Sequence, residues 1–100
     1  MEHKVKNPLL TAIINYSVER LHPQRIILFG SRARGDAETR SDYDIAIEAP
    51  EIDDNIWSQF VLDAENSINT LLKVDLIRLD TAGAELRKRI MAEGKLIYER

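Results

Sequence analysis

The chain has 100 residues, 44% of them hydrophobic and 31% charged, a composition that fits one soluble domain spanning residues 1–100. Its formal net charge of −3 disfavours a general nucleic-acid coat protein, and we expect no direct DNA binding. The sequence has no cysteine, no apolar run of roughly 20 residues and no signal-like start, which predicts a cytoplasmic protein without disulfides or membrane association.

Apolar residues at helical spacing predict a first helix that opens near Asn7-Pro8 and stops at His22-Pro23. The short β-branched run Arg25–Phe29 then predicts a buried strand. Gly30-Ser31 ends that strand abruptly, and residues 32–37 are a candidate for a short helix. The apolar positions of the first helix are Leu9, Leu10, Ile13, Ile14, Val18 and Leu21.

A second strand is predicted over Asp42–Ile47, with Pro50 ending it, and Asp53 or Asp54 caps a long helix. The apolar face of that helix consists of Trp57, Phe60, Val61, Ala64, Ile68, Leu71 and Leu72. Trp57 and Phe60 are therefore predicted to be core residues and not a platform for stacked bases.

The last third predicts a strand over Val74–Leu79 and a helix that Thr81 caps and Gly94 stops. That helix carries Leu86, Ile90 and Met91, and residues 95–98 are a candidate for a short final strand. The order is α-β-α-β-α-β-α with an optional terminal strand. Spacing alone favours an α/β sandwich and leaves the strand directions open.

Two aspartates stand two residues apart on the second predicted strand. Asp42 and Asp44 therefore leave the same face of the sheet, where each carboxylate favours protonation of the other unless a cation lies between them. Magnesium suits this arrangement because it prefers one or two carboxylates together with substrate phosphate oxygens.

A third carboxylate, Asp75, is the second residue of the third predicted strand. If that strand lies beside the second, Asp75 reaches the same face, and three carboxylates suffice to hold two metal ions in phosphoryl transfer. Asp75 is then the natural group to activate an incoming hydroxyl.

The turn after the first strand offers groups that suit a phosphate. Gly30 lets the backbone approach a phosphate closely, and the Ser31 hydroxyl adds a donor. Arg32 and Arg34 lie in the same turn, and their guanidinium groups suit bidentate contact with phosphate oxygens.

Each element also has a structural interpretation. An Asp-x-Asp pair can be a solvated strand edge or a cap, and Gly30 can be a turn glycine. Arg32 and Arg34 can pair with Asp36 or Glu38 on the surface. Asp75 is harder to dismiss, because an unpaired charge in an apolar strand is costly. The combination of these residues favours the functional interpretation.

Residues 30–44, Gly-Ser-Arg-Ala-Arg-Gly-Asp-Ala-Glu-Thr-Arg-Ser-Asp-Tyr-Asp, resemble the signature of the DNA polymerase β-like nucleotidyltransferase superfamily, in its minimal nucleotidyltransferase (MNT) branch. The segment Val74-Asp75-Leu76-Ile77 is similar to the family's third-carboxylate strand, and residues 90–98 resemble its closing helix and strand. Tyr43 replaces a residue that is often small or aliphatic, and we expect it to face away from the metals.

The resemblance implies an α+β fold with a small mixed sheet and a reaction that transfers AMP from ATP to a hydroxyl with Mg²⁺. It places Asp42, Asp44 and Asp75 as catalytic and metal-binding residues, and Gly30, Ser31, Arg32 and Arg34 at the nucleotide. It further implies an antitoxin that modifies a tyrosine of a HEPN-type partner, in a homo- or hetero-oligomer.

The length of the chain leaves no room for a substrate-gripping domain, so we expect a partner protein to present the acceptor. Two alternatives remain open. One is a non-catalytic nucleotide-binding module that neutralises a partner by binding. The other is the catalytic subunit of a small-molecule transferase, for instance one acting on an aminoglycoside.

Overall fold

The helices and strands follow the predicted order along the chain. A computed structural model describes residues 7–35, 42–67 and 74–100. Within these ranges the elements are α1 (Pro8–Leu21), β1 (Arg25–Phe29), α2 (Ser31–Arg34), β2 (Tyr43–Glu48), α3 (Asp54–Ser67), β3 (Val74–Arg78), a 3₁₀ helix η1 (Leu79–Thr81), α4 (Ala84–Glu93) and β4 (Lys95–Glu99). The terminal strand is thereby confirmed.

The four strands form one mixed sheet in the order β3-β2-β1-β4. Strand β1 pairs antiparallel with both β2 and β4, whereas β2 and β3 run parallel. The mixed α+β fold implied by the resemblance is therefore confirmed. Spacing alone favoured an α/β sandwich. That prediction gave the layers correctly but did not give the strand directions.

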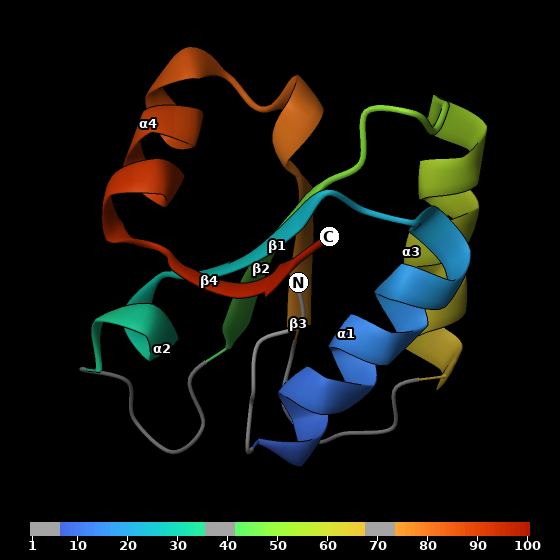
Figure 1. Ribbon diagram of the computed structural model, residues 1–100, viewed down its shortest axis with the longest axis horizontal. Coiled ribbons are helices and arrows are strands. Elements are labelled where there is room, and N and C mark those ends of the chain that lie inside the picture. Colours follow the sequence, from blue (N-terminus) through green and yellow to red (C-terminus); the bar gives the residue numbers. More distant parts are fainter. Residues whose placement is uncertain (1–6, 36–41, 68–73) are drawn as a thin grey trace.

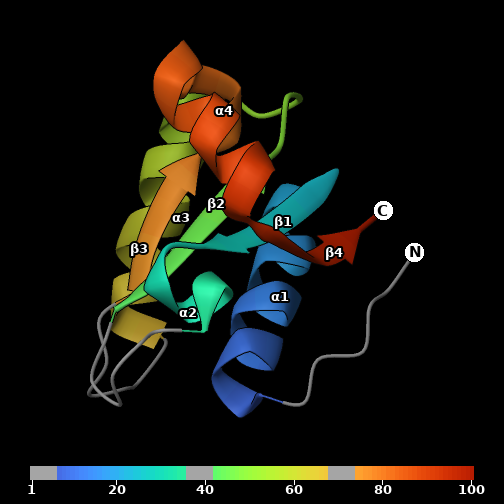
Figure 2. The same cartoon turned by 90° about the vertical axis from the view of Figure 1, so that its left-hand side faces the viewer.

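Helices cover both faces of the sheet. In Figures 1 and 2, α1 and α3 lie against one face, α4 lies over the other, and α2 sits at the end of the sheet where β1 finishes. The larger core lies under α1 and α3 and includes Ile13, Ile45 and Phe60. A smaller core lies under α4 and consists of Ile27, Ala46, Leu79 and Ile90.

Helix α1 opens where predicted, with Asn7 as its cap, and α3 is capped by one of the two predicted residues. The Asn7 side-chain oxygen accepts hydrogen bonds from the backbone N–H groups of Leu9 and Leu10, at 2.9 and 3.2 Å. Asp53 caps α3 by accepting from the N–H of Ile56 at 2.8 Å. These side chains satisfy N–H groups that have no partner within the helix.

The predicted start of α4 was wrong. Thr81 belongs to the 3₁₀ helix, and α4 begins at Ala84 after Gly83, which has no side chain to cap it. Met91 is also not a core residue, because its side chain is 46% exposed whereas that of Ile90 is 1% exposed. One residue along a helix is a rotation of about 100°, which carries Met91 away from the sheet.

Several strand and helix limits shift by one residue or more. Strand β3 ends at Arg78, because Leu79 already turns into the 3₁₀ helix. Helix α2 is shorter than predicted, since Gly35 ends it at a φ of 83°. Residues 36–37 and the apolar positions Ile68, Leu71 and Leu72 lie outside the described residues. Within the described part of the chain, no helix has the length and apolar character needed to cross a bilayer.

Candidate active site

The strand directions bring three segments of the motif to one end of the sheet. The end of β1 meets the starts of β2 and β3, because β1 runs opposite to both. Asp44 pairs with Phe29 on one side and with Asp75 on the other. The condition on which the assignment of Asp75 depends, that its strand lies beside β2, is thus met, and the catalytic roles remain predictions.

Asp44 and Asp75 project from the same face of the sheet. On β2 the flanking Tyr43 and Ile45 are buried under α1 and α3, and on β3 the flanking Val74 and Leu76 pack against that same core. Successive side chains on a strand alternate, so the two carboxylates point to the opposite face. Parallel neighbours lie about 4.8 Å apart, which makes this a close pair of half-buried acids.

Asp42 stands slightly apart from this pair. It precedes β2, which begins at Tyr43, and its side chain is exposed. Among residues 7–35, 42–67 and 74–100, no three His, Cys, Asp or Glu side chains gather closely enough to hold a metal ion. The described geometry therefore contains a two-carboxylate pair, with Asp42 at its margin.

Gly30 is required for two independent reasons. Its backbone has φ 75° and ψ −159°, a region that is essentially restricted to glycine. A Cβ atom at this position would also collide with the Oδ2 atom of Asp44. The glycine thus leaves room for the carboxylate directly beside the turn, and Ser31 follows at the first position of α2.

Tyr43 faces away from the carboxylates, as predicted, and joins two elements that the sequence did not connect. Its side chain is 5% exposed, and its hydroxyl accepts a hydrogen bond from Asn7 Nδ2 at 2.9 Å. The guanidinium carbon of Arg32 lies 4.3 Å from the centroid of the Tyr43 ring. Sequence reasoning missed Asn7, since a helix cap carries no signal of a second role.

Arg34 is the last residue of α2 and forms an ion pair with α4. Its Nη1 atom is 3.7 Å from Glu93 Oε2 at the end of α4, and both side chains are nearly half exposed. The partners expected for it, Asp36 and Glu38, lie outside the described residues. The ion pair connects α2 to α4, the helix that covers the face of the sheet from which the two carboxylates project.

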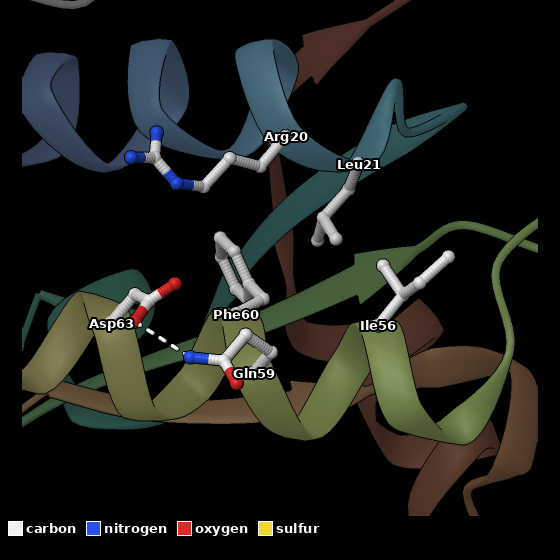
Figure 3. A pocket seen from close by; sticks show the side chains of 6 residues that line it. All are labelled: Arg20, Leu21, Ile56, Gln59, Phe60 and Asp63. Atoms are coloured by element: carbon white, nitrogen blue, oxygen red, sulfur yellow. Dashed lines mark hydrogen bonds between the residues drawn. The ribbon is translucent and has the colours of Figure 1, made fainter.

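A cavity of about 240 Å³ lies elsewhere, between α1 and α3. Figure 3 shows Phe60 at its centre, with Leu21 and Ile56 beside it and Arg20 above. Gln59 donates to Asp63 along its rim at 2.9 Å. This groove contains none of the predicted site residues.

An ion cluster occupies the opposite end of β1 and β2. Arg25 donates two hydrogen bonds to the Glu48 carboxylate, at 2.7 and 3.2 Å, and Arg87 Nη2 lies 3.6 Å from it. The hydrogen bond from Arg25 lowers the pKa of Glu48, against the opposing effect of burial. The same hydrogen bond raises the pKa of Arg25.

The family model described as polymerase beta, nucleotidyltransferase, matches residues 11–100. This range includes every residue assigned to the candidate site. A search among curated proteins found no match.

Several solved structures with a similar fold are toxin–antitoxin complexes. A chain of a toxin–antitoxin structure with AMP-PNP has a TM-score of 0.73 and 26% identity, with 90% of this chain and 73% of that chain covered. A chain from a complex of MNT antitoxin with tri-AMPylated HEPN toxin of Shewanella oneidensis has a TM-score of 0.69 and 23% identity, with 92% and 71% covered. The second likeness shows the fold alone.

Proposed function

The chain belongs to the polymerase β nucleotidyltransferase family, and from that premise we propose that it transfers AMP from ATP to a tyrosine hydroxyl of a HEPN-type partner. In this proposal residues 1–100 act as one minimal domain, in the cytoplasm, as the antitoxin of a toxin–antitoxin pair. The nucleotidyltransferase class follows from the family, and the donor nucleotide, the metal, the acceptor and the cellular role are the proposed parts.

One observation carries the assignment of the site. Asp44 and Asp75 are paired across parallel strands, and Gly30 leaves space directly against the Asp44 carboxylate. Two half-buried carboxylates side by side on one face are a donor set that a divalent cation carrying phosphate oxygens would use.

The donor set fits magnesium. Carboxylate oxygens are the ligands this ion prefers, and it binds through one or two carboxylates plus phosphate oxygens. Asp44 and Asp75 would hold it, with Asp42 joining from the margin of the site. When bound, the ion would stabilise negative charge on the transferring phosphate.

The chain's own residues account for the remaining steps. The acceptor oxygen attacks the α-phosphorus of ATP. The bond between the α-phosphorus and the oxygen that bridges it to the β-phosphorus breaks, and pyrophosphate leaves. Asp75 would accept the hydroxyl proton. Ser31 and the arginines of the turn, Arg32 and Arg34, would orient the phosphates by hydrogen bonding.

The partner assignment is supported by the compared structures. A similar chain occurs in a toxin–antitoxin structure that contains AMP-PNP, an ATP analogue, and another in a complex whose HEPN toxin carries AMP groups. A partner that presents its own hydroxyl would supply the acceptor. A hetero-oligomer with that partner follows from the proposal.

The test is incubation of the chain with ATP, Mg²⁺ and the HEPN-type partner, followed by intact-mass and peptide mass spectrometry. We expect AMP-sized increments on a partner tyrosine, and loss of about 100-fold or more in rate for Asp44→Asn. Glu65→Gln is the matched control, because Glu65 is an exposed acid on α3 away from the pair. No increment within a verified complex would overturn the transfer proposal.

Variants of the same aspartates distinguish an antitoxin that only binds its partner from one that acts by transfer. The double variant Asp42→Asn, Asp44→Asn should lose neutralisation of the partner if transfer is the mechanism. Unchanged neutralisation, measured as ribonuclease activity of the partner, would favour the non-catalytic alternative. Transfer to a small molecule would appear in an acceptor screen with labelled ATP.

A further inference from the structure

We propose that Tyr43 is a positioning residue that holds Arg32 for contact with the nucleotide phosphates, an inference that rests on the proposed nucleotidyl transfer. Tyr43 lies between Asp42 and Asp44 but projects from the opposite face of β2. Its effect on the reaction must therefore pass through another residue.

The contact between Arg32 and Tyr43 is suited to holding a cation in place. The guanidinium carbon lies 4.3 Å from the ring centroid, within the range of a cation–π interaction. A cation–π contact is an attraction between the charge and the ring and requires no hydrogen-bond acceptor. The ring therefore helps to fix the position of a guanidinium group whose geometry also suits phosphate oxygens.

Tyr43 is itself fixed from two sides. Its ring is buried in the core under α1 and α3, and its hydroxyl accepts the hydrogen bond from Asn7. Asn7 in turn caps α1 with its other side-chain atom. A rigid helix start thus supports the ring on which Arg32 rests.

The location of Arg32 makes the arrangement relevant to the site. It is the second residue of α2, directly after the Gly30-Ser31 turn that adjoins the Asp44 carboxylate. A long arginine side chain loses much rotamer freedom when it binds a phosphate. Holding it beforehand on Tyr43 reduces that loss, which lowers the dissociation constant for the nucleotide.

The experiment measures binding of a non-hydrolysable ATP analogue with Mg²⁺ to the full chain, and steady-state transfer to the partner. The variants are Arg32→Gln, Tyr43→Met, their combination, and Tyr43→Phe. Tyr43→Met fills the volume with a flexible apolar chain but offers no aromatic face, whereas Tyr43→Phe keeps the face. Thermal unfolding monitors the fold of each variant.

We expect Tyr43→Met and Arg32→Gln each to weaken nucleotide binding about 3- to 30-fold, the range of a cation–π contact. The combined variant should bind the nucleotide no more weakly than Arg32→Gln alone, because Tyr43 acts through Arg32. Tyr43→Phe should stay within about threefold of wild type. The KM for ATP should rise more than kcat falls, a split that general loss of folding would not produce.

Three results would overturn the proposal. They are multiplicative losses of nucleotide binding in the combined variant, equal losses of binding in Tyr43→Phe and Tyr43→Met, or wild-type binding by a folded Tyr43→Met.

If Tyr43→Met does not fold, nuclear magnetic resonance of the wild-type Arg32 side chain decides. The ring should shift its Nε–H proton upfield, and the ATP analogue should move that resonance; a resonance indifferent to the nucleotide overturns the proposal. A wild type that binds no nucleotide would instead contradict the proposed function.

Discussion

At the scale of single residues, the site depends most on the lack of a side chain at Gly30. Both its backbone conformation and the nearby Asp44 carboxylate exclude a side chain there. Gly35 provides an internal comparison, since it has a φ of 83° but a Cβ added to it would meet no atom within 4 Å. The two glycines share the backbone requirement and differ in the contact with the carboxylate.

We predict that Gly30→Ala destabilises the protein by about 1–3 kcal/mol and also lowers nucleotidyl transfer by about 100-fold or more, because the new methyl group displaces Asp44. Gly35→Ala should cost about 1 kcal/mol through backbone strain and retain most of the transfer rate. Urea unfolding and the mass-spectrometric assay measure the two effects. Equal loss of activity in both variants would contradict the steric explanation.

Residue-level prediction from the sequence succeeded where chemistry and spacing combine. Gly30 and Asp44 were identified from their place in a long motif, and the structure brings them into contact. The Asn7–Tyr43–Arg32 connection was not predicted, because its members lie in three elements and each has an ordinary local interpretation.

At the scale of elements, the junction of α4 and β4 is packed tightly onto β1. A Cβ atom on Gly94 would collide with the Ile27 side chain and with the backbone oxygen of Ile90. Its φ of −74° is ordinary, so the restriction here is steric. By contrast, Gly83 at the start of α4 faces open space at a similarly ordinary φ of −61°.

We predict that Gly94→Ala destabilises the fold by about 1–3 kcal/mol, because β1 and α4 must separate to admit the methyl group. Gly83→Ser should instead stabilise it by about 0.5–1 kcal/mol, through a new helix cap and a less flexible unfolded chain. Chemical denaturation compares both variants with wild type. A neutral Gly94→Ala, or a destabilising Gly83→Ser, would contradict this steric account of the junction.

The elements themselves were largely predictable, and their limits and directions less so. Periodicity located α1 and α3, and β-branched runs located β1 and β3. The Thr81 cap failed because an isolated threonine before a helical pattern looks the same whether it opens the helix or ends a preceding 3₁₀ turn. Strand direction depends on tertiary pairing, which hydrophobic spacing does not encode.

At the scale of the whole molecule, the two central strands carry different chemistry at their two ends. Asp44 and the Gly30 turn lie at one end, and the Arg25–Glu48 pair lies at the other, with buried Ile26 and Ile47 in between. Asp44 and Asp75 adjoin one another at the first end, and Glu48 at the second end pairs with arginines from β1 and α4. Stability and catalysis should therefore respond separately to changes at the two ends.

The pH dependence of unfolding tests this separation. Because Arg25 lowers the pKa of Glu48 in the folded state, the pair contributes stability above the unfolded pKa of about 4.3, and this contribution is lost as the pH falls through the lower folded value. The raised pKa of Arg25 keeps its guanidinium charged throughout this window. Wild type should thus lose stability more steeply below about pH 4.3 than Glu48→Gln does.

At neutral pH, Glu48→Gln should cost about 1–2 kcal/mol, since it weakens a charge-assisted hydrogen bond at a largely buried carboxylate. Glu51→Gln is the matched control, because Glu51 is 73% exposed and 4.0 Å from Arg100, so its loss should cost only a few tenths of a kcal/mol. Urea unfolding from about pH 3 to 7 measures both variants.

Transfer activity per folded molecule should be unchanged in Glu48→Gln, because the buried centre of β1 and β2 separates this cluster from the carboxylates at the other end. Parallel low-pH slopes in wild type and Glu48→Gln, or a specific loss of transfer, would mean that the two ends are coupled through the sheet.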